Sequence, residues 1–450
     1  MKRVHFSGFA NATNQSHHYT VPGIFCCTTP NLRLTINEFF HRNIIYIAAT
    51  YEEQTRTKVI FLNLETLINE YSMRILIVVR KLTMGGLQKQ ALTFAQTAAK
   101  KGHDVHLMIL KSEKTENELK IPAGITVHRP DFHSRLFKSL SGILNYLSGH
   151  MLKPLIFKKI KDFNTGYEYS RYFAEYIEEL ERRHGRFDMI FLRGQGCFEY
   201  FHQFNRERCY CYIDGKPFHY QGFRSDKINR ILYGFPKKFI CVSEQLKKAL
   251  LDIEPEAQAI CSHNFLDFEE IRRLSGEITD PLPERYIVNV GRLTEVKSQD
   301  FLIRIMPKLP DDIKLLLVGD GKFKLRLKQI AEQYNCSDRV VFLGKRDNPY
   351  PYIKNAKVLV HTSQKEGFGL IFLEALILNT PIVATESIGG MRDIMKGEIL
   401  SRQIVPRDPE LLAEKIVETI KAPYQSSDVF YREYEASTAF DKLLSRLESF

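Results

Sequence analysis

The feature that most constrains the fold is a pattern of strand, glycine turn and helix that begins twice along the chain. The first copy opens with MRILIVV at residues 73–79, an apolar, β-branched run typical of a buried parallel strand. Gly85 and Gly86 follow, then a helical pattern over residues 87–100 and a second strand pattern over residues 105–110. This order is how a doubly wound α/β sheet begins.

The second copy begins with a strand pattern at residues 286–293, followed by a helical pattern at residues 298–309 and another strand at residues 314–321. Further strand patterns occupy residues 340–343, 358–361 and 381–384. We therefore expect an α/β protein with two Rossmann-like halves, joined by a hinge near residues 255–280. Residues 431–450 read as an amphipathic helix that could pack against either half.

Residues 1–72 fit neither half, because they show no sustained helical period. We expect a poorly ordered N-terminal extension. A sharper hypothesis is that Met73, directly before the first strand, is the translation start and that residues 1–72 are not native.

The charge of the chain is concentrated in its first half. The net charge is +11; residues 73–255 carry 31 basic and 19 acidic residues, whereas residues 256–450 carry 27 and 29. Residues 135–163 mix leucines and aromatic residues with lysines. This stretch fits an anionic membrane surface or, equally, two core-packed helices with a solvated basic face.

The sequence also excludes several classes of protein and location. No apolar run is long enough to cross a bilayer, and no secretory signal is recognisable. We therefore expect a cytoplasmic protein, either free or held at the inner face of the cytoplasmic membrane. No nucleic-acid-binding motif with interleaved aromatic residues occurs, so nucleic acid is not expected as a partner.

The most specific passage is VLVHTSQKEGFGLIFLEAL, which starts at residue 358 and contains Glu366 and Glu374 eight residues apart. If the loop of Gly367, Phe368 and Gly369 opens a helix, unpaired backbone amides there point at an anion. Glu374, two turns along that helix, would accept hydrogen bonds from ribose hydroxyls. Two solvated carboxylates on a helix are the alternative, but they do not explain two glycines around a phenylalanine.

Two further features complete the predicted site. Arg292 and Lys297 follow the strand at residues 286–293, and a guanidinium and an ammonium together can neutralise a diphosphate. Gly85 and Gly86 allow a phosphate to approach the backbone closely. Neither GxGxxG nor GxxxxGK[ST] is present, which argues against a dinucleotide-dependent dehydrogenase and a P-loop NTPase.

These residues carry a family resemblance. The segments MRILIVVRKLTMGGLQKQALTFAQTAAKKGHDV, ICVSEQLKKAL, YIVNVGRLTEVKSQDFLI, KLLLVGDG and EGFGLIFLEAL resemble glycosyltransferase family 4 over roughly residues 73–425. The resemblance implies a GT-B fold, two Rossmann-like domains facing across a cleft. It divides the chain into an acceptor domain at residues 73–260, a donor domain at residues 261–425 and a C-terminal helix at residues 426–450.

The resemblance also implies an activity, which is retaining sugar transfer from a nucleotide sugar, usually UDP-linked, without a metal or other cofactor. The acceptor would be a glycan or a lipid-linked sugar of lipopolysaccharide or another surface polysaccharide. An epimerase of the same fold and a non-catalytic nucleotide-sugar binding protein are the alternatives.

The resemblance assigns roles by position. Arg292 and Lys297 would hold the diphosphate and stabilise charge on the leaving group, and Glu366 would lie by the donor sugar with the 367–369 backbone. Glu374 would bind ribose, and Gly86 would close on the phosphates from the other domain. Many family members carry a histidine after an N-domain strand, where this chain has Arg193 and Gln195 in the sequence IFLRGQG. Two alternatives follow: Arg193 or Gln195 takes its place, or the site differs here.

Overall fold

The structure is a computed structural model of the chain, and it divides into two compact units, residues 1–72 and residues 73–450. It describes residues 34–41, 44–53 and 56–63, and it describes residues 72–450 except 83–84, 112–118, 139, 141, 145–165, 199, 218–224, 235 and 279. In the first unit, strands β1 (Leu34–His41), β2 (Ile44–Glu53) and β3 (Arg56–Asn63) form an antiparallel sheet in that order. The hypothesis of a start at Met73 stays a prediction.

The second unit begins with a parallel sheet whose described strands run in the order β10-β9-β8-β7-β4-β5-β6. The first strand after the start, β4, is buried along residues 75–79, as its continuous apolar sequence requires. The strands are β4 (Arg74–Val79), β5 (Asp104–Ile109), β6 (Ile125–His128), β7 (Met189–Arg193), β8 (Cys209–Ile213), β9 (Lys238–Cys241) and β10 (Gln258–Cys261). The helices are α2 (Gly86–Lys100), α3 (Phe132–Leu136), α5 (Gly166–His184), α6 (Gln195–Phe198), α7 (Ser225–Tyr233) and α8 (Glu244–Leu251).

A second parallel sheet follows, in the order β13-β12-β11-β14-β16-β18. Its strands are β11 (Tyr286–Val290), β12 (Lys314–Val318), β13 (Val340–Gly344), β14 (Val358–His361), β16 (Ile382–Thr385) and β18 (Ile404–Val405). The helices of this half are α9 (Phe268–Leu274), α10 (Gln299–Arg304), α11 (Lys324–Gln333), α12 (Tyr350–Lys354), α13 (Leu370–Ile377), α14 (Met391–Ile394), α15 (Gly397–Ser401) and α16 (Pro409–Lys421). The two sheets confirm the predicted α/β class with two Rossmann-like halves.

Two predicted helices are shorter than their patterns. The helix expected over residues 298–309 ends at Arg304, and a 3₁₀ turn with Pro307 follows, because proline cannot donate to a continuing helix. The C-terminal helix, α17 (Ala436–Glu448), begins only after Glu435, whose side chain caps it by accepting from the Thr438 amide at 3.0 Å.

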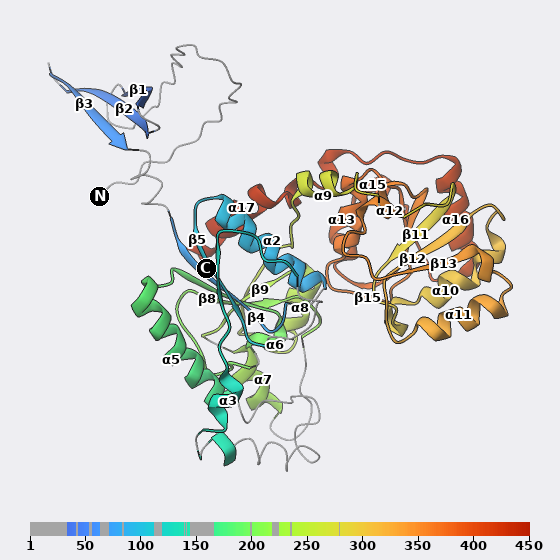
Figure 1. Cartoon of the computed structure of the whole chain (residues 1–450), viewed down its shortest axis with the longest axis horizontal. Helices are drawn as coiled ribbons and strands as arrows, with labels where there is room; N and C mark the ends of the chain where they lie inside the picture. Colours follow the sequence, from blue (N-terminus) through green and yellow to red (C-terminus); the bar gives the residue numbers. More distant parts are fainter. Residues whose placement is uncertain are drawn as a thin grey trace. The chain divides into compact units, whose positions relative to one another are not determined.

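The C-terminal helix returns to the first half of the unit, which decides between the two packings that the sequence allowed. It lies beside α2 (Figure 1), and the rings of Phe440 and Phe94 meet edge to face with centroids 5.1 Å apart. Arg446 Nη1 donates to the Cys261 carbonyl at 2.6 Å. The last residues of the chain therefore stabilise the domain that the first strand opens.

The strand orders also predict where a ligand binds. In each sheet the order reverses beside the first strand, between β4 and β7 in one and between β11 and β14 in the other. Ligands of open α/β sheets bind at such switch points, outside the carboxyl ends of the strands. Gly85, Arg292 and Glu366 all come from the segments that follow these strand ends.

Candidate functional site

The nine residues predicted from the sequence line one cavity of about 1190 Å³. They come from both halves of residues 73–450, so the structure brings together the two switch points. The nine are Gly85, Gly86, Arg292, Lys297, Glu366, Gly367, Phe368, Gly369 and Glu374.

At the carboxyl end of β14, Glu366 is held between two basic side chains. Lys297 Nζ donates to Glu366 Oε2, and His361 Nε2 lies 3.3 Å from the same oxygen. Burial acts to raise the pKa of Glu366, but His361 and the positive charge of Lys297 outweigh burial, and the pKa falls to about 2. Glu366 is therefore an anion at neutral pH, and it fixes the position of the Lys297 ammonium.

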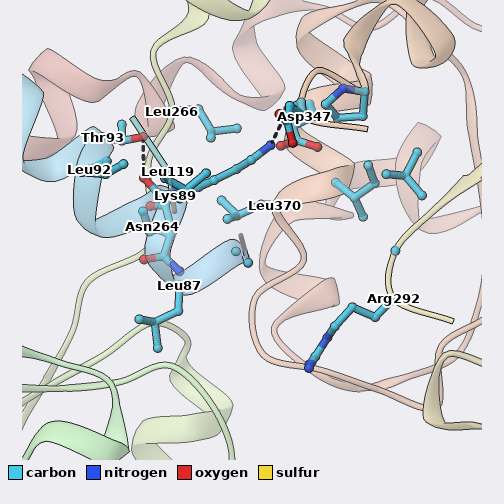
Figure 2. Close-up of a pocket in the computed structure, with 18 of the residues that line it drawn as sticks. Leu87, Lys89, Leu92, Thr93, Leu119, Asn264, Leu266, Arg292, Asp347 and Leu370 are labelled. Carbon is cyan, nitrogen blue, oxygen red and sulfur yellow. Dashed lines mark hydrogen bonds between the residues drawn. The ribbon is translucent and has the colours of Figure 1, made fainter. Parts of the chain in front are cut away.

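Arg292, the second predicted cation, is not held by a described carboxylate in the way that Lys297 is. Its side chain is exposed, and within the described part of the chain no acidic group lies within ion-pair distance of its guanidinium. Figure 2 shows this side chain extending from the loop after β11. The site thus holds one cation that is already paired and another that is available for an anion.

The 367–369 loop is shaped by its glycines and by a short second pairing. Gly369 has a φ of 89° at the N-cap of α13, a left-handed conformation that side chains other than glycine rarely adopt. The preceding β15 (Lys365–Glu366) pairs with β17 (Ile388–Gly389), and the Gly390 amide donates to the Gly367 carbonyl at 2.9 Å. These contacts fix the loop that precedes the helix N-terminus.

Phe368, between the two glycines, has a packing role. Its side chain is buried, its ring stacks on His263 with centroids 5.1 Å apart, and it meets Tyr434 edge to face at 5.7 Å. His263 belongs to the segment that joins the two sheets, so the phenylalanine ties the loop to that connection. The backbone of Phe368, and not its ring, is the part suited to contact a ligand.

Glu374 lies one turn inside α13 and is buried, with 9% of its surface exposed. Burial raises its pKa, and the charge of Lys89 together with a hydrogen bond from Tyr350 opposes that rise. Lys89 comes from α2 in the other half and reaches across the cavity, where its Nζ donates to the Asp347 carbonyl at 3.4 Å (Figure 2). A carboxylate in this environment accepts hydrogen bonds from hydroxyl groups.

The wall opposite the 367–369 loop is the start of α2. Gly86 is the first residue of the helix, and a Cβ there would lie 4.0 Å from the Leu370 side chain of α13. Helix starts from both halves thus face one cavity, and each has backbone amides that no helical hydrogen bond satisfies.

The structure does not bear out Arg193 as a cavity residue. Its side chain is 1% exposed and lies behind the wall, whereas Asp214, which follows β8 directly, lines the cavity. The side chain of Gln195 is outside the described residues. Sequence reasoning missed both Asp214 and His361, although each stands at the carboxyl end of a strand of a parallel sheet, which is where such folds place functional groups.

The described residues contain neither a metal-binding cluster nor a membrane-spanning helix. No group of three or more His, Cys, Asp or Glu side chains in the described part of the chain is arranged to hold a metal ion. Among the same residues, no helix combines the length and apolarity needed to span a bilayer. Residues 145–165, most of the predicted membrane-facing stretch, lie outside the described residues.

Comparison with known proteins gives the second half a family. Residues 270–435 match the family model described as glycosyl transferases group 1. This half therefore resembles the group 1 glycosyltransferases. Its match begins at α9 and ends at Glu435, so it includes Arg292, Lys297 and the whole 366–374 motif.

Two curated relatives are also named as glycosyltransferases. The chain is 32% identical over 148 residues to the uncharacterized glycosyltransferase MJ1059 of Methanocaldococcus jannaschii, covering 30% of this chain and 36% of that protein. It is 31% identical over 132 residues to N-acetylgalactosamine-N,N′-diacetylbacillosaminyl-diphospho-undecaprenol 4-alpha-N-acetylgalactosaminyltransferase of Campylobacter jejuni, covering 29% and 36%. The matches therefore span little more than a third of each relative's length.

The likeness to a solved structure extends further and concerns the fold. Anabaena Alr3699/HepE, solved with UDP and glucose, superposes with a TM-score of 0.60 at 17% identity, covering 84% of this chain and all of the other. The chain thus has the GT-B fold that the resemblance implied.

Proposed function

We propose that this protein is a glycosyltransferase that moves a sugar from a nucleotide sugar to a glycan or lipid-linked acceptor. The observation that carries the proposal is the pairing of Lys297 with Glu366 beside Arg292, which has no acidic partner among the described residues. All three face the Gly85–Gly86 turn across one cavity. This arrangement suits a diphosphate that gains charge as the sugar departs. The group 1 domain match over the same residues supports it.

The finer features of the reaction are also part of the proposal. UDP is the nucleotide we favour, because the Anabaena structure holds UDP and glucose in the same fold. We propose transfer with retention of configuration, in which the departing diphosphate itself takes the acceptor proton and no metal or other cofactor takes part. The product would belong to lipopolysaccharide or another surface polysaccharide.

The location and partners complete the proposal. An undecaprenyl-linked sugar is a suitable acceptor class, because the Campylobacter relative is named for such an acceptor. The enzyme would then work in the cytoplasm, at the inner face of the membrane, through peripheral contact with anionic lipid. Nucleic acid is not part of the proposed function.

The experiment is a thermal-shift screen of nucleotide sugars, followed by turnover of the best ligand with and without a glycan acceptor. A ligand that binds only the folded state raises the apparent stability, so a UDP-sugar should raise the melting temperature. Acceptor-stimulated release of UDP supports the transferase. An epimeric nucleotide sugar as product would instead indicate an epimerase, and tight binding without turnover would indicate a binding protein.

A further inference from the structure

Asp214 is a buried carboxylate with unused hydrogen-bonding capacity. Its side chain is 12% exposed, and neither Oδ1 nor Oδ2 has a hydrogen-bond partner among the described residues. Buried polar groups are nearly always hydrogen-bonded, and leaving one unpaired is unfavourable. A carboxylate in this state at the edge of a cavity is therefore suited to accept hydrogen bonds from a ligand.

The charge of Asp214 is already balanced by the protein. Arg193 Nη2 lies 3.6 Å from Asp214 Oδ1 and donates to Asn264 Oδ1 at 3.3 Å, and the guanidinium lies 3.7 Å from the Tyr212 ring centroid. Burial raises the pKa of Asp214, and the charge of Arg193 and the neighbouring Asn264 side chain oppose that rise. A cationic ligand would leave excess positive charge in a buried place, whereas an uncharged hydroxyl would satisfy the free oxygens without adding charge.

Asp214 lies directly against the 367–369 loop. A Cβ on Gly367 would lie 2.4 Å from the Asp214 carbonyl oxygen, so the 367–369 loop passes directly against Asp214 and has room only for glycine there. Asp214 therefore stands in the first domain at the point where it meets the residues proposed to surround the donor sugar.

We propose that Asp214 binds a sugar hydroxyl at the transfer point, and that Arg193 is the positioning residue that holds its carboxylate. The inference rests on the proposed function and deepens it, because it adds a contact from the first domain to those that the second domain makes. The hydroxyl can belong to the sugar being transferred or to the acceptor. The chemistry of recognition is the same in both cases.

The test compares Asp214→Asn with wild type in two assays. The first is calorimetric binding of UDP and of UDP-glucose, which is replaced by the nucleotide sugar that the thermal-shift screen ranks first if that is a different one. The second is transfer kinetics. If the hydroxyl is on the donor, affinity for the nucleotide sugar falls about tenfold while UDP affinity stays within about twofold. If it is on the acceptor, both affinities hold and the acceptor KM rises about tenfold. The exposed Asp441→Asn is the matched control and should change neither.

Two outcomes would overturn the inference. One is Asp214→Asn with wild-type affinities and kinetics, and the other is an equal loss for UDP and the nucleotide sugar, which would mean a general distortion of the cavity. If Asp214→Asn fails to fold, Asp214→Glu keeps the charge beside Arg193, shifts the carboxylate by one methylene and should show the same selective loss. A wild type that binds no nucleotide sugar would instead refute the proposed function itself.

The role of Arg193 needs a readout that a purely structural residue would not change. Arg193→Met should move the acid limb of the transfer rate profile to higher pH, because Asp214 would lose the charge that opposes the rise in its pKa. Arg193→Lys should restore most of the wild-type profile. A lower rate with an unmoved pH profile in Arg193→Met would reject the positioning role.

Discussion

The Lys297 ammonium donates a hydrogen bond to the Glu366 carboxylate. The cation proposed to neutralise a departing diphosphate is therefore held in place before any nucleotide sugar binds. Lys297 is only 20% exposed, and an ammonium with no partner in such a place would be unfavourable. Glu366 thus holds the Lys297 ammonium in position, and an incoming diphosphate would share the cation with it. This relationship leads to the first two predictions.

Lys297→Met should reduce transfer by two to three orders of magnitude, on the order of the loss when one group that stabilises transition-state charge is removed. The rate of acceptor-dependent UDP release under saturating donor measures it. Lys365→Met is the matched control, since Lys365 is exposed and does not line the cavity. Equal rates for the two variants would contradict the role given to Lys297.

Glu366 should also make folding stability depend on pH. Its pKa is about 2 in the folded protein against 4.5 ordinarily, so its contribution is fully present above pH 4.5 and is lost as the pH falls toward 2. The full contribution is about 3 kcal/mol as an upper bound. Denaturant unfolding at several pH values should show the difference between wild type and Glu366→Gln shrinking below pH 4.5. A difference that stays constant from pH 6 to pH 3 would rule out this contribution.

Lys89 and Glu374 give a third prediction, about nucleotide affinity. Lys89→Met removes the charge that opposes the raised pKa of Glu374, so more of the carboxyl is protonated and UDP binding weakens. The loss should be larger at pH 5 than at pH 8, because high pH restores the carboxylate. Calorimetric titration with UDP at both pH values measures it. Lys100→Met, an exposed lysine on the same helix, should leave the affinity and its pH dependence unchanged.

The sequence predicted those parts of the fold and of the site for which a single segment carries a recognisable pattern of apolar residues or glycines. The apolar runs of β4 and β11 predicted the two sheets, and the glycines after β4 and β14 predicted two of the cavity walls. Arg193, by contrast, was one of two residues proposed to replace the family histidine. A strand end on its own gives no sign of which way its side chain points. The structure shows it buried beside Tyr212.

The residues that the sequence did not predict act through contacts between distant segments. Asp214 matters because Gly367 packs on its carbonyl, and Lys89 matters because α2 brings it opposite Glu374. Neither contact leaves a periodic pattern in one stretch of sequence. Such groups could be found only once the two halves were placed face to face.

The last prediction concerns membrane contact by the stretch that starts at α3. Phe137, Leu140 and Leu144 expose 43%, 75% and 57% of their surface, and the lysines of residues 153–161 follow in sequence, outside the described residues. Exposed apolar side chains next to basic ones are typical of a surface that binds anionic lipid. The alternative, that these side chains belong to an ordinary surface, predicts no difference between lipid compositions.

Sedimentation with phosphatidylglycerol vesicles separates the two readings. Replacing Leu140 and Leu144 with serine should weaken binding about tenfold per residue, from the apolar area that no longer enters the bilayer. Replacing Lys153, Lys158, Lys159 and Lys161 with glutamine should weaken it mainly at low salt, because salt screens the attraction in the wild type. Leu325→Ser, equally exposed at 75% on α11, is the control and should bind as wild type does. Binding that neither set of substitutions changes would show that this stretch does not contact the membrane.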